Sequence, residues 1–283
     1  MPVLTEPRAA NRPWALRNLP PLPRVAVRLL QILSQEESVM QQIVELIRMD
    51  AAVAAEILRL ANSAVYGHSS RIDNLLRAVV MLGREKVKAL CTTVAMSMYT
   101  RPVVRYAALG KCWRHSLACA FLSEGLATAC SIDRDQAYTA GLVHDIGRLG
   151  LLVGYPMEYS RLIEVSVEDS LDILEVERSM FDGDHCEIGR WLAEEWEFPA
   201  DLRDVIANHH AVPPEGPPTL RSVVSLACRL ADTLDFHAVV PKFPSSFDEL
   251  RDQLPSTARN ALEAGPQGLA ASIRRKVDSV TRM

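Results

Sequence analysis

Hydrophobic side chains recur along most of this chain at intervals of three and four residues, which is the period of an amphipathic helix. The pattern is clearest over residues 25–33, 39–47 and 53–61. Strict alternation of apolar and polar positions, typical of half-buried strands, is nearly absent, and only 13 of the 283 residues are glycine. The sequence therefore predicts an all-α fold, a compact set of helices rather than a solenoid.

Proline residues divide the predicted helices into groups, because proline ends or excludes a helix. One group of prolines precedes the first helix, Pro102 precedes a change to histidine-rich sequence, and Pro241 and Pro244 follow the last long helix. The predicted division is a leader at 1–16, an N-terminal helical part at 17–103, a helical core at 104–240 and a C-terminal helical extension at 241–283. We expect three short helical stretches in the extension.

Composition and charge restrict the class of protein. Hydrophobic residues make up 48% and charged residues 23%, the balance of a globular protein. With 31 Lys+Arg against 35 Asp+Glu, the net charge is −4, which excludes a broadly basic protein that coats nucleic acid. Residues 73–90 loosely resemble a helix-turn-helix. We favour an ordinary helical hairpin with Gly83 at its corner, and we do not expect nucleic acid as a partner.

The sequence also bears on location. No apolar run approaches the roughly 18–20 residues of a membrane helix, and the N-terminus has no apolar signal segment. The six cysteines are spread along the chain without a C-x-x-C pair, so we expect buried free thiols rather than disulfides or a thiolate metal site. These features predict a cytoplasmic protein with no membrane partner.

Candidate chemistry centres on His144 and Asp145, which stand side by side in an apolar helical run. An imidazole and a carboxylate are costly to bury without a partner, and a divalent cation is a partner for both. Neighbours on a helix diverge by about 100°, so other helices must close such a site. His115 and Asp232 lie in similar apolar runs and are the candidate further ligands. The alternative for any single histidine is a structural role in the core.

The order His115, His144-Asp145, Asp232 resembles the signature of the HD superfamily of metal-dependent phosphohydrolases. More narrowly, the stretches LPPLPRVAVRLLQIL, MDAAVAAEILRLANSAVYG, AVVMLG, WRHS and AGLVHDIGRL resemble the HDOD family over roughly residues 17–236. That family is a bacterial signalling branch of the superfamily. The resemblance implies an N-terminal helical subdomain packed on an HD-like helical core that carries the metal site.

His185, His209 and His210 resemble the extra histidines of the related HD-GYP phosphodiesterases. The resemblance implies one or two divalent ions, with Asp145 as the bridging ligand, and it does not distinguish Fe, Mn, Ni, Co and Zn. The chain departs from the HD-GYP pattern because AVPPEGPP follows the histidine pair and Lys111 stands where a ligating Glu can occur. Arg148 replaces the usual lysine; it could hold a substrate phosphate, or be a solvated helix-end charge.

Two functions are consistent with these residues. The resemblance favours a signalling module whose metal site binds a phosphorylated small molecule or nucleotide and which signals to a protein partner. The alternative is an active phosphohydrolase or cyclic-nucleotide phosphodiesterase, in which Asp145 and Arg148 would be the catalytic residues and two ions would activate a shared water.

Overall fold

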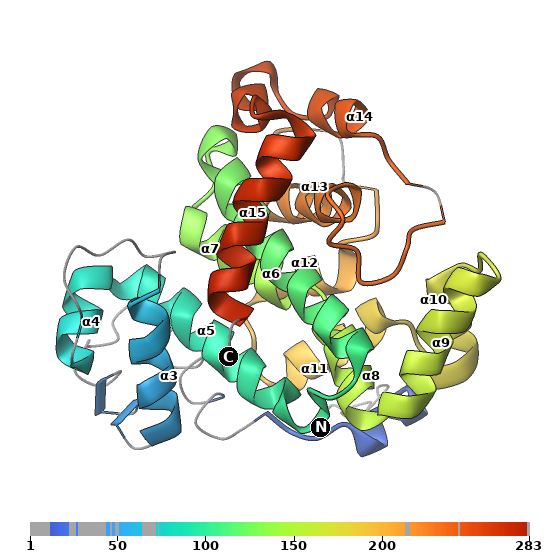
Figure 1. The fold of residues 1–283 in the computed structure, drawn as a ribbon. Helices are drawn as coiled ribbons and strands as arrows, with labels where there is room; N and C mark the ends of the chain where they lie inside the picture. Colours follow the sequence, from blue (N-terminus) through green and yellow to red (C-terminus); the bar gives the residue numbers. More distant parts are fainter. Residues whose placement is uncertain are drawn as a thin grey trace, which may run out of the picture.

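The structure is a computed structural model that describes residues 12–22, 27, 44, 45, 47, 48, 51–63, 72, 74–212, 216–242 and 244–281. Every regular element within these residues is a helix (Figure 1). The all-α prediction is therefore confirmed. The predicted helices over residues 25–33 and 39–47 lie largely outside the described residues, whereas the third, over 53–61, corresponds to α3 (Ala51–Ala61).

The stretch that resembled a helix-turn-helix forms a helical hairpin of α4 (Leu75–Leu82) and α5 (Arg84–Thr100). The Asn74 side chain caps the start of α4, and Gly83 ends it at a φ of +76°, a conformation that favours glycine. Most of α5 beyond Lys88 is buried, and the Thr93 hydroxyl lies 3.2 Å from the Tyr138 hydroxyl on α7. Beyond Lys88, α5 is therefore an interior helix of the fold.

The long helix α6 (Ala107–Ala127) runs through the middle of the molecule (Figure 1). Its side chains are apolar on almost every side, as expected of a helix surrounded by others. It packs against α7 (Arg134–Val143), α13 (Leu220–Thr233) and α15 (Gly265–Thr281). Residues far apart in the sequence thereby reach one interior.

The remaining helices extend the core around the ends of α6 and α7. They are α8 (Ile146–Gly154), α9 (Pro156–Glu168), α10 (Ile173–Phe181), α11 (His185–Glu195), α12 (Ala200–Asn208) and α14 (Phe247–Asp252). With η4 (Ser256–Leu262), α14 and α15 account for the three helical stretches predicted in the C-terminal extension. An ion pair of 2.8 Å between Arg114 and Asp278 joins α15 to α6.

Residues 12–16, the part of the predicted leader that the structure describes, pack against the core. They include the start of a 3-10 turn, η1 (Trp14–Asn18), in which Ala15 and Leu16 are buried. The Trp14 ring lies 5.4 Å from the Tyr155 ring, and the Tyr155 hydroxyl donates to the Ala15 carbonyl at 2.9 Å. The leader therefore becomes part of the fold by residue 13, and the division at 16 remains a prediction.

Two further expectations from the sequence concern the cysteines and membrane-spanning helices. All six cysteines are buried free thiols, as predicted. Of the helices that the structure describes, none combines the length and apolarity needed to cross a bilayer.

Candidate metal centre

His144 and Asp145 occupy the junction between α7 and α8 rather than the middle of one continuous helix. α7 ends at Val143 and α8 begins at Ile146. The helical run predicted around these two residues is therefore interrupted at the two residues themselves. One donor atom each from His144, Asp145 and His209 lies within 4.8 Å of the others. Nε2 of His209, which follows α12, is 3.7 Å from Asp145 Oδ1. We call these three residues the primary donor group.

In three buried histidines the same ring nitrogen, Nδ1, contacts the backbone, which leaves Nε2 for the centre. Nδ1 of each lies at hydrogen-bond distance from a backbone carbonyl: 2.9 Å for His115, 2.7 Å for His144 and 3.1 Å for His209. A carbonyl oxygen only accepts, so Nδ1 carries the proton and donates it. Nε2 therefore keeps its lone pair, and the backbone holds each ring in the tautomer that ligates metal.

Two atoms of the primary donor group are buried without a hydrogen-bond partner among the described residues. They are His144 Nε2 and Asp145 Oδ1, on side chains of residues only 1% and 2% exposed. Leaving a buried polar atom unsatisfied costs about 1–3 kcal/mol, and more for a charged group. A divalent cation would satisfy both atoms and offset the carboxylate charge. These residues therefore fit a divalent metal ion.

Ionisation of the centre is consistent with metal ligation. Burial lowers the pKa of His144 and of His209, and burial together with His185 lowers the pKa of His210 to about 3. All three imidazoles are thus neutral at physiological pH. Burial by itself would raise the pKa of the Asp145 carboxyl, but the guanidinium of Arg148 holds it well below its usual range. Neutral imidazoles and an ionised carboxylate are the ligating forms.

Arg148 is an interior residue, only 4% exposed, so it is not a solvated charge at a helix end. Its Nε donates to Asp145 Oδ2 at 3.0 Å. Its Nη1 lies 3.2 Å from the Tyr159 hydroxyl and 3.4 Å from Glu177 Oε1, and its Nη2 lies 3.1 Å from His185 Nε2. Most of the guanidinium's donors are therefore engaged inside the protein.

Glu177 belongs to the centre although the sequence analysis did not identify it. This residue of α10 is completely buried; its Oε2 accepts from His185 Nδ1 at 2.6 Å and from the His185 backbone N–H at 2.9 Å. Its other oxygen accepts from the Tyr159 hydroxyl. A detectable signal existed, because Ile173, Glu177 and Phe181 recur at four-residue intervals, which puts a glutamate on an apolar stripe.

The carboxylate of Glu177 also occupies the start of α11. The N-terminus of a helix attracts anions, and here the protein's own Glu177 is that anion. Interactions with Arg148 and with His185 outweigh burial and lower the pKa of Glu177 to about 2.

A second donor group adjoins the first and shares His209 with it. One donor atom each from His185, Cys186, His209 and His210 lies within 4.8 Å of the others. The Nε2 atoms of His185 and His210 are 3.1 Å apart, and Cys186 Sγ is 3.9 Å from His209 Nε2. The three histidines were predicted from the sequence, whereas the contribution of Cys186 was not. We call these four residues the secondary donor group.

His115 and Asp232 lie on the other side of the centre. His115 Nδ1 is 3.4 Å from Asp232 Oδ1, and its Nε2 is 3.5 Å from Cys228 Sγ. A close donor group joins His115 and His144 to Cys228, and Asp232 belongs to none of the close groups found among the described residues. Burial raises the pKa of Asp232 to about 6, against the opposing effect of His115.

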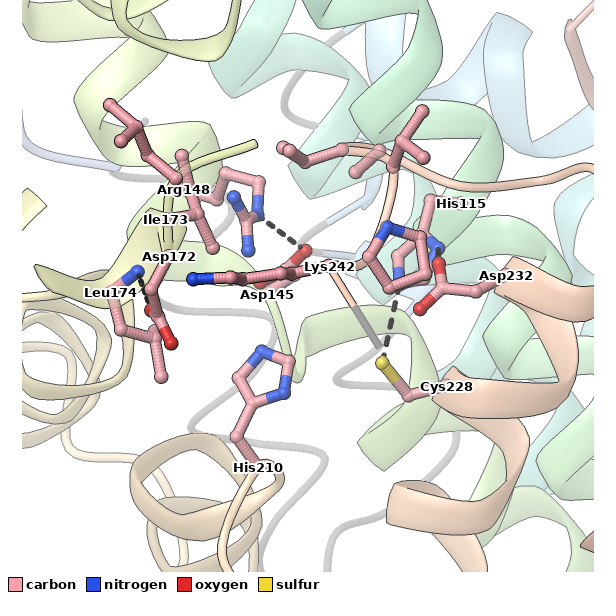
Figure 2. A pocket seen from close by; sticks show the side chains of 15 residues that line it. His115, Asp145, Arg148, Asp172, Ile173, Leu174, His210, Cys228, Asp232 and Lys242 are labelled. Carbon is pink, nitrogen blue, oxygen red and sulfur yellow. Dashed lines mark hydrogen bonds and ion pairs between the residues drawn. The ribbon is translucent and has the colours of Figure 1, made fainter. Parts of the chain in front are cut away.

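A cavity of about 380 Å³ opens beside these side chains. Figure 2 shows Arg148 paired with Asp145, and His115 paired with Cys228 and Asp232 on one side. The start of α10 and the segment after α13 complete the wall. The lining residues are His115, Asp145, Arg148, Leu171, Asp172, Ile173, Leu174, His210, Cys228, Asp232, Ala238, Val239, Val240, Pro241 and Lys242. The cavity thus combines a polar floor with a largely aliphatic wall.

Several known proteins are similar to this chain. A curated protein of Treponema pallidum (strain Nichols), named "uncharacterized protein", is 26% identical over 245 residues, which is 84% of this chain and 47% of that protein. The chain therefore spans about half the length of this relative. An HDOD domain protein of unknown function from Geobacter sulfurreducens superposes with a TM-score of 0.74 at 23% identity, covering 94% of both chains.

Two further solved structures share the fold. A protein of Shewanella amazonensis SB2B, provisionally named a phosphohydrolase, has a TM-score of 0.70 at 24% identity and covers 94% of this chain and 96% of its own. A protein of Marinobacter aquaeolei VT8, provisionally named for signal transduction, has a TM-score of 0.67 at 21% identity, covering 91% and 60%. The family model of the HDOD domain matches residues 19–212. The chain belongs to the HDOD domain family.

Proposed function

We propose that this protein is a signalling module that holds a divalent metal ion in the primary donor group and binds a phosphorylated ligand in the adjoining cavity. The observation that carries the proposal is a pair of buried atoms without a hydrogen-bond partner among the described residues, His144 Nε2 and Asp145 Oδ1. Around Asp145 Oδ1 stand two further imidazole nitrogens, His185 Nε2 at 3.3 Å and His209 Nε2 at 3.7 Å. A bound cation removes the cost of leaving His144 Nε2 and Asp145 Oδ1 unsatisfied.

The cavity beside the metal centre would attract an anionic ligand once a divalent ion is bound. Its lining has two cationic side chains, Arg148 and Lys242, and three carboxylates, Asp145, Asp172 and Asp232, so the added charge of the ion decides the balance. A divalent ion at Asp145 would be a further positive charge, which a phosphate oxygen can approach directly. A phosphorylated small molecule or nucleotide supplies such oxygens. The aliphatic wall formed by residues 238–241 and 171–174 then contacts the rest of the ligand.

A regulatory role is supported by family membership and by the provisional signalling name of the Marinobacter protein, which shares the fold. In this role a ligand bound in the cavity shifts the two segments that line it, and a protein partner binds differently to the shifted segments. The segment after α13 leads directly into α14, so a ligand in the cavity is connected to the C-terminal extension.

Metal content tests the proposal. Protein purified without chelator should contain a divalent ion, and His144→Ala should lose it because His144 Nε2 is a central donor. Asp252→Asn, which changes an exposed carboxylate at the end of α14, should retain the wild-type metal content. Titration calorimetry should then detect inorganic phosphate binding to the metal-loaded protein but not to His144→Ala. Unchanged metal content in His144→Ala would refute the assignment of the centre.

The alternative function is metal-dependent phosphate-ester hydrolysis. The specific observation in its favour is the secondary donor group, which shares His209 with the first as a pair of adjacent metal sites would. Metal-loaded protein should be assayed on generic phosphomonoester and phosphodiester substrates. Turnover that is lost in Asp145→Ala would favour the enzyme, whereas phosphate binding without turnover on either class would favour the signalling module.

A further inference from the structure

We propose that the guanidinium of Arg148 takes the place of a second metal ion, so that this centre holds one divalent cation rather than two. The inference rests on the proposed metal centre, and it specifies how many ions that centre accepts. Its basis is the position of Arg148 between the primary and secondary donor groups.

The two oxygens of Asp145 have different partners. In a two-metal site a bridging carboxylate offers one oxygen to each of two ions that lie about 3.5–4 Å apart. Here Asp145 Oδ2 accepts from Arg148 Nε at 3.0 Å, and only Oδ1 lacks a hydrogen-bond partner. Asp145 therefore has one oxygen for a metal ion and one that the guanidinium already uses. A second ion on Oδ2 would have to share that oxygen with the guanidinium.

The guanidinium is held in place by residues that are not metal ligands. Its Nη1 lies 3.2 Å from the Tyr159 hydroxyl and 3.4 Å from Glu177 Oε1. Tyr159 and Glu177 are completely buried, and they are hydrogen-bonded to each other. Arginine keeps its charge under all physiological conditions. The centre therefore contains a permanent positive charge whose position does not depend on a bound ion.

That charge faces the secondary donor group. Arg148 Nη2 is 3.1 Å from His185 Nε2, the nitrogen that would ligate a second ion. Since a metal–imidazole bond is about 2.1 Å, an ion on His185 would lie no more than about 5 Å from Nη2. In an interior of low dielectric constant, the repulsion between a divalent ion and a guanidinium at that distance is strong. The secondary donor group thus has atoms that can ligate a metal ion, but the positive electrostatic potential of Arg148 disfavours a second cation there.

Counting bound ions tests the proposal. After equilibrium dialysis against excess Co²⁺, metal analysis should find one ion per wild-type chain. Arg148→Met has a side chain of similar length without charge and should bind two ions, a twofold increase. Combining Arg148→Met with His185→Ala should restore one. Arg178→Met is the matched control, because Arg178 on α10 pairs with Asp184 at 2.6 Å and its side chain is 54% exposed; it should bind one ion.

Cobalt absorption reports whether the secondary donor group is filled, provided that the band survives Cys228→Ala, because Cys228 with His115 and His144 forms another group that contains a thiol. An ion in the secondary donor group would gain the Cys186 thiolate as a ligand, and thiolate-to-cobalt charge transfer absorbs strongly in the near ultraviolet. The wild-type protein should lack this band, and Arg148→Met should show it. This measurement keeps the proposal open to refutation if Arg148→Met does not fold.

The outcomes separate the two proposals. Two ions in the wild-type protein, a thiolate band in the wild-type protein that survives Cys228→Ala, or a single ion in folded Arg148→Met would each overturn the role of Arg148 and leave the metal centre standing. No ion in the wild-type protein would overturn the proposed function, and the inference with it.

Discussion

Replacing Gly147 with alanine tests how α8 and α11 approach each other. Gly147 follows the His144-Asp145 pair by two residues, on the first turn of α8. A Cβ built on it would lie 1.9 Å from the His185 carbonyl oxygen and 2.6 Å from the Gly189 backbone nitrogen. Contacts below 3.0 Å essentially never occur for a real Cβ. The two helices must therefore separate by roughly 1 Å, and the obstructing atoms are backbone that cannot rotate away.

Overpacking of this kind costs about 1–3 kcal/mol when side chains can adjust. Because backbone meets backbone here, we expect Gly147→Ala to lose about 3 kcal/mol. For this chain of 283 residues, with an unfolding entropy of about 2.1 cal/mol/K per residue, that corresponds to a fall in Tm of about 5 °C. Gly125→Ala is the matched control, since Gly125 lies within α6 and a Cβ there meets no atom within 4 Å. It should be neutral or stabilising by about 0.5–1 kcal/mol, from helix propensity.

Urea unfolding and thermal melts, both followed by circular dichroism, measure the two variants side by side. The expected result is a large loss of stability for Gly147→Ala and none for Gly125→Ala. Equal stabilities for the two variants would refute the close approach of α8 to α11. The position of His185 relative to Asp145 depends on that approach, so this result would also remove the support for the arrangement of the two donor groups.

Two further predictions concern the interior around Arg148. The folded-state pKa of Glu177 is about 2 against an ordinary value of 4.5, so its ionised form stabilises the fold above pH 4.5 by roughly 3 kcal/mol, and this contribution is lost as the pH falls from 4.5 towards 2. The unfolding free energy of Glu177→Gln should therefore vary less over this range than that of the wild-type protein, and parallel curves would contradict this. Tyr159→Phe removes a hydroxyl shared by Arg148 and Glu177 and should cost about 1–3 kcal/mol in urea melts. Tyr106→Phe, whose hydroxyl contacts only an exposed arginine at 3.5 Å, should cost little, and equal losses would argue against the buried contact.

The helical architecture was predictable because its signals are local. Apolar residues at helical spacing identify α3, and Gly83 marks the corner of the α4–α5 hairpin, where its φ of +76° requires glycine. The hairpin's position in the interior was not predictable, because the same residues could have formed a surface pair. It follows from the packing of α5 against α7.

Most candidate ligands of the centre were also predictable, but their grouping was not. Motif order identified His144, Asp145 and His209, whose donor atoms lie together. Asp232 was predicted as a ligand together with His115; the two side chains lie 3.4 Å apart, and their role as ligands stays a prediction. Cys186 was expected to be only a buried thiol, yet its sulfur lies beside a ring of the centre. A sequence shows which side chains can ligate metal, whereas distances between helices determine which of them converge.

By itself, then, the amino-acid sequence determined that this chain is helical, that it belongs with HD-type proteins, and which imidazoles and carboxylates can ligate a metal ion. Tertiary structure alone decided the role of Arg148. Its spacing from Asp145 is compatible equally with a solvated charge and with a phosphate clamp. Its burial arises because α8, α9 and α10 pack so that Tyr159 and Glu177 surround its guanidinium. The periodicity of a helix is set by neighbours in the chain, whereas the partner of a buried charge is set by residues that only folding brings together.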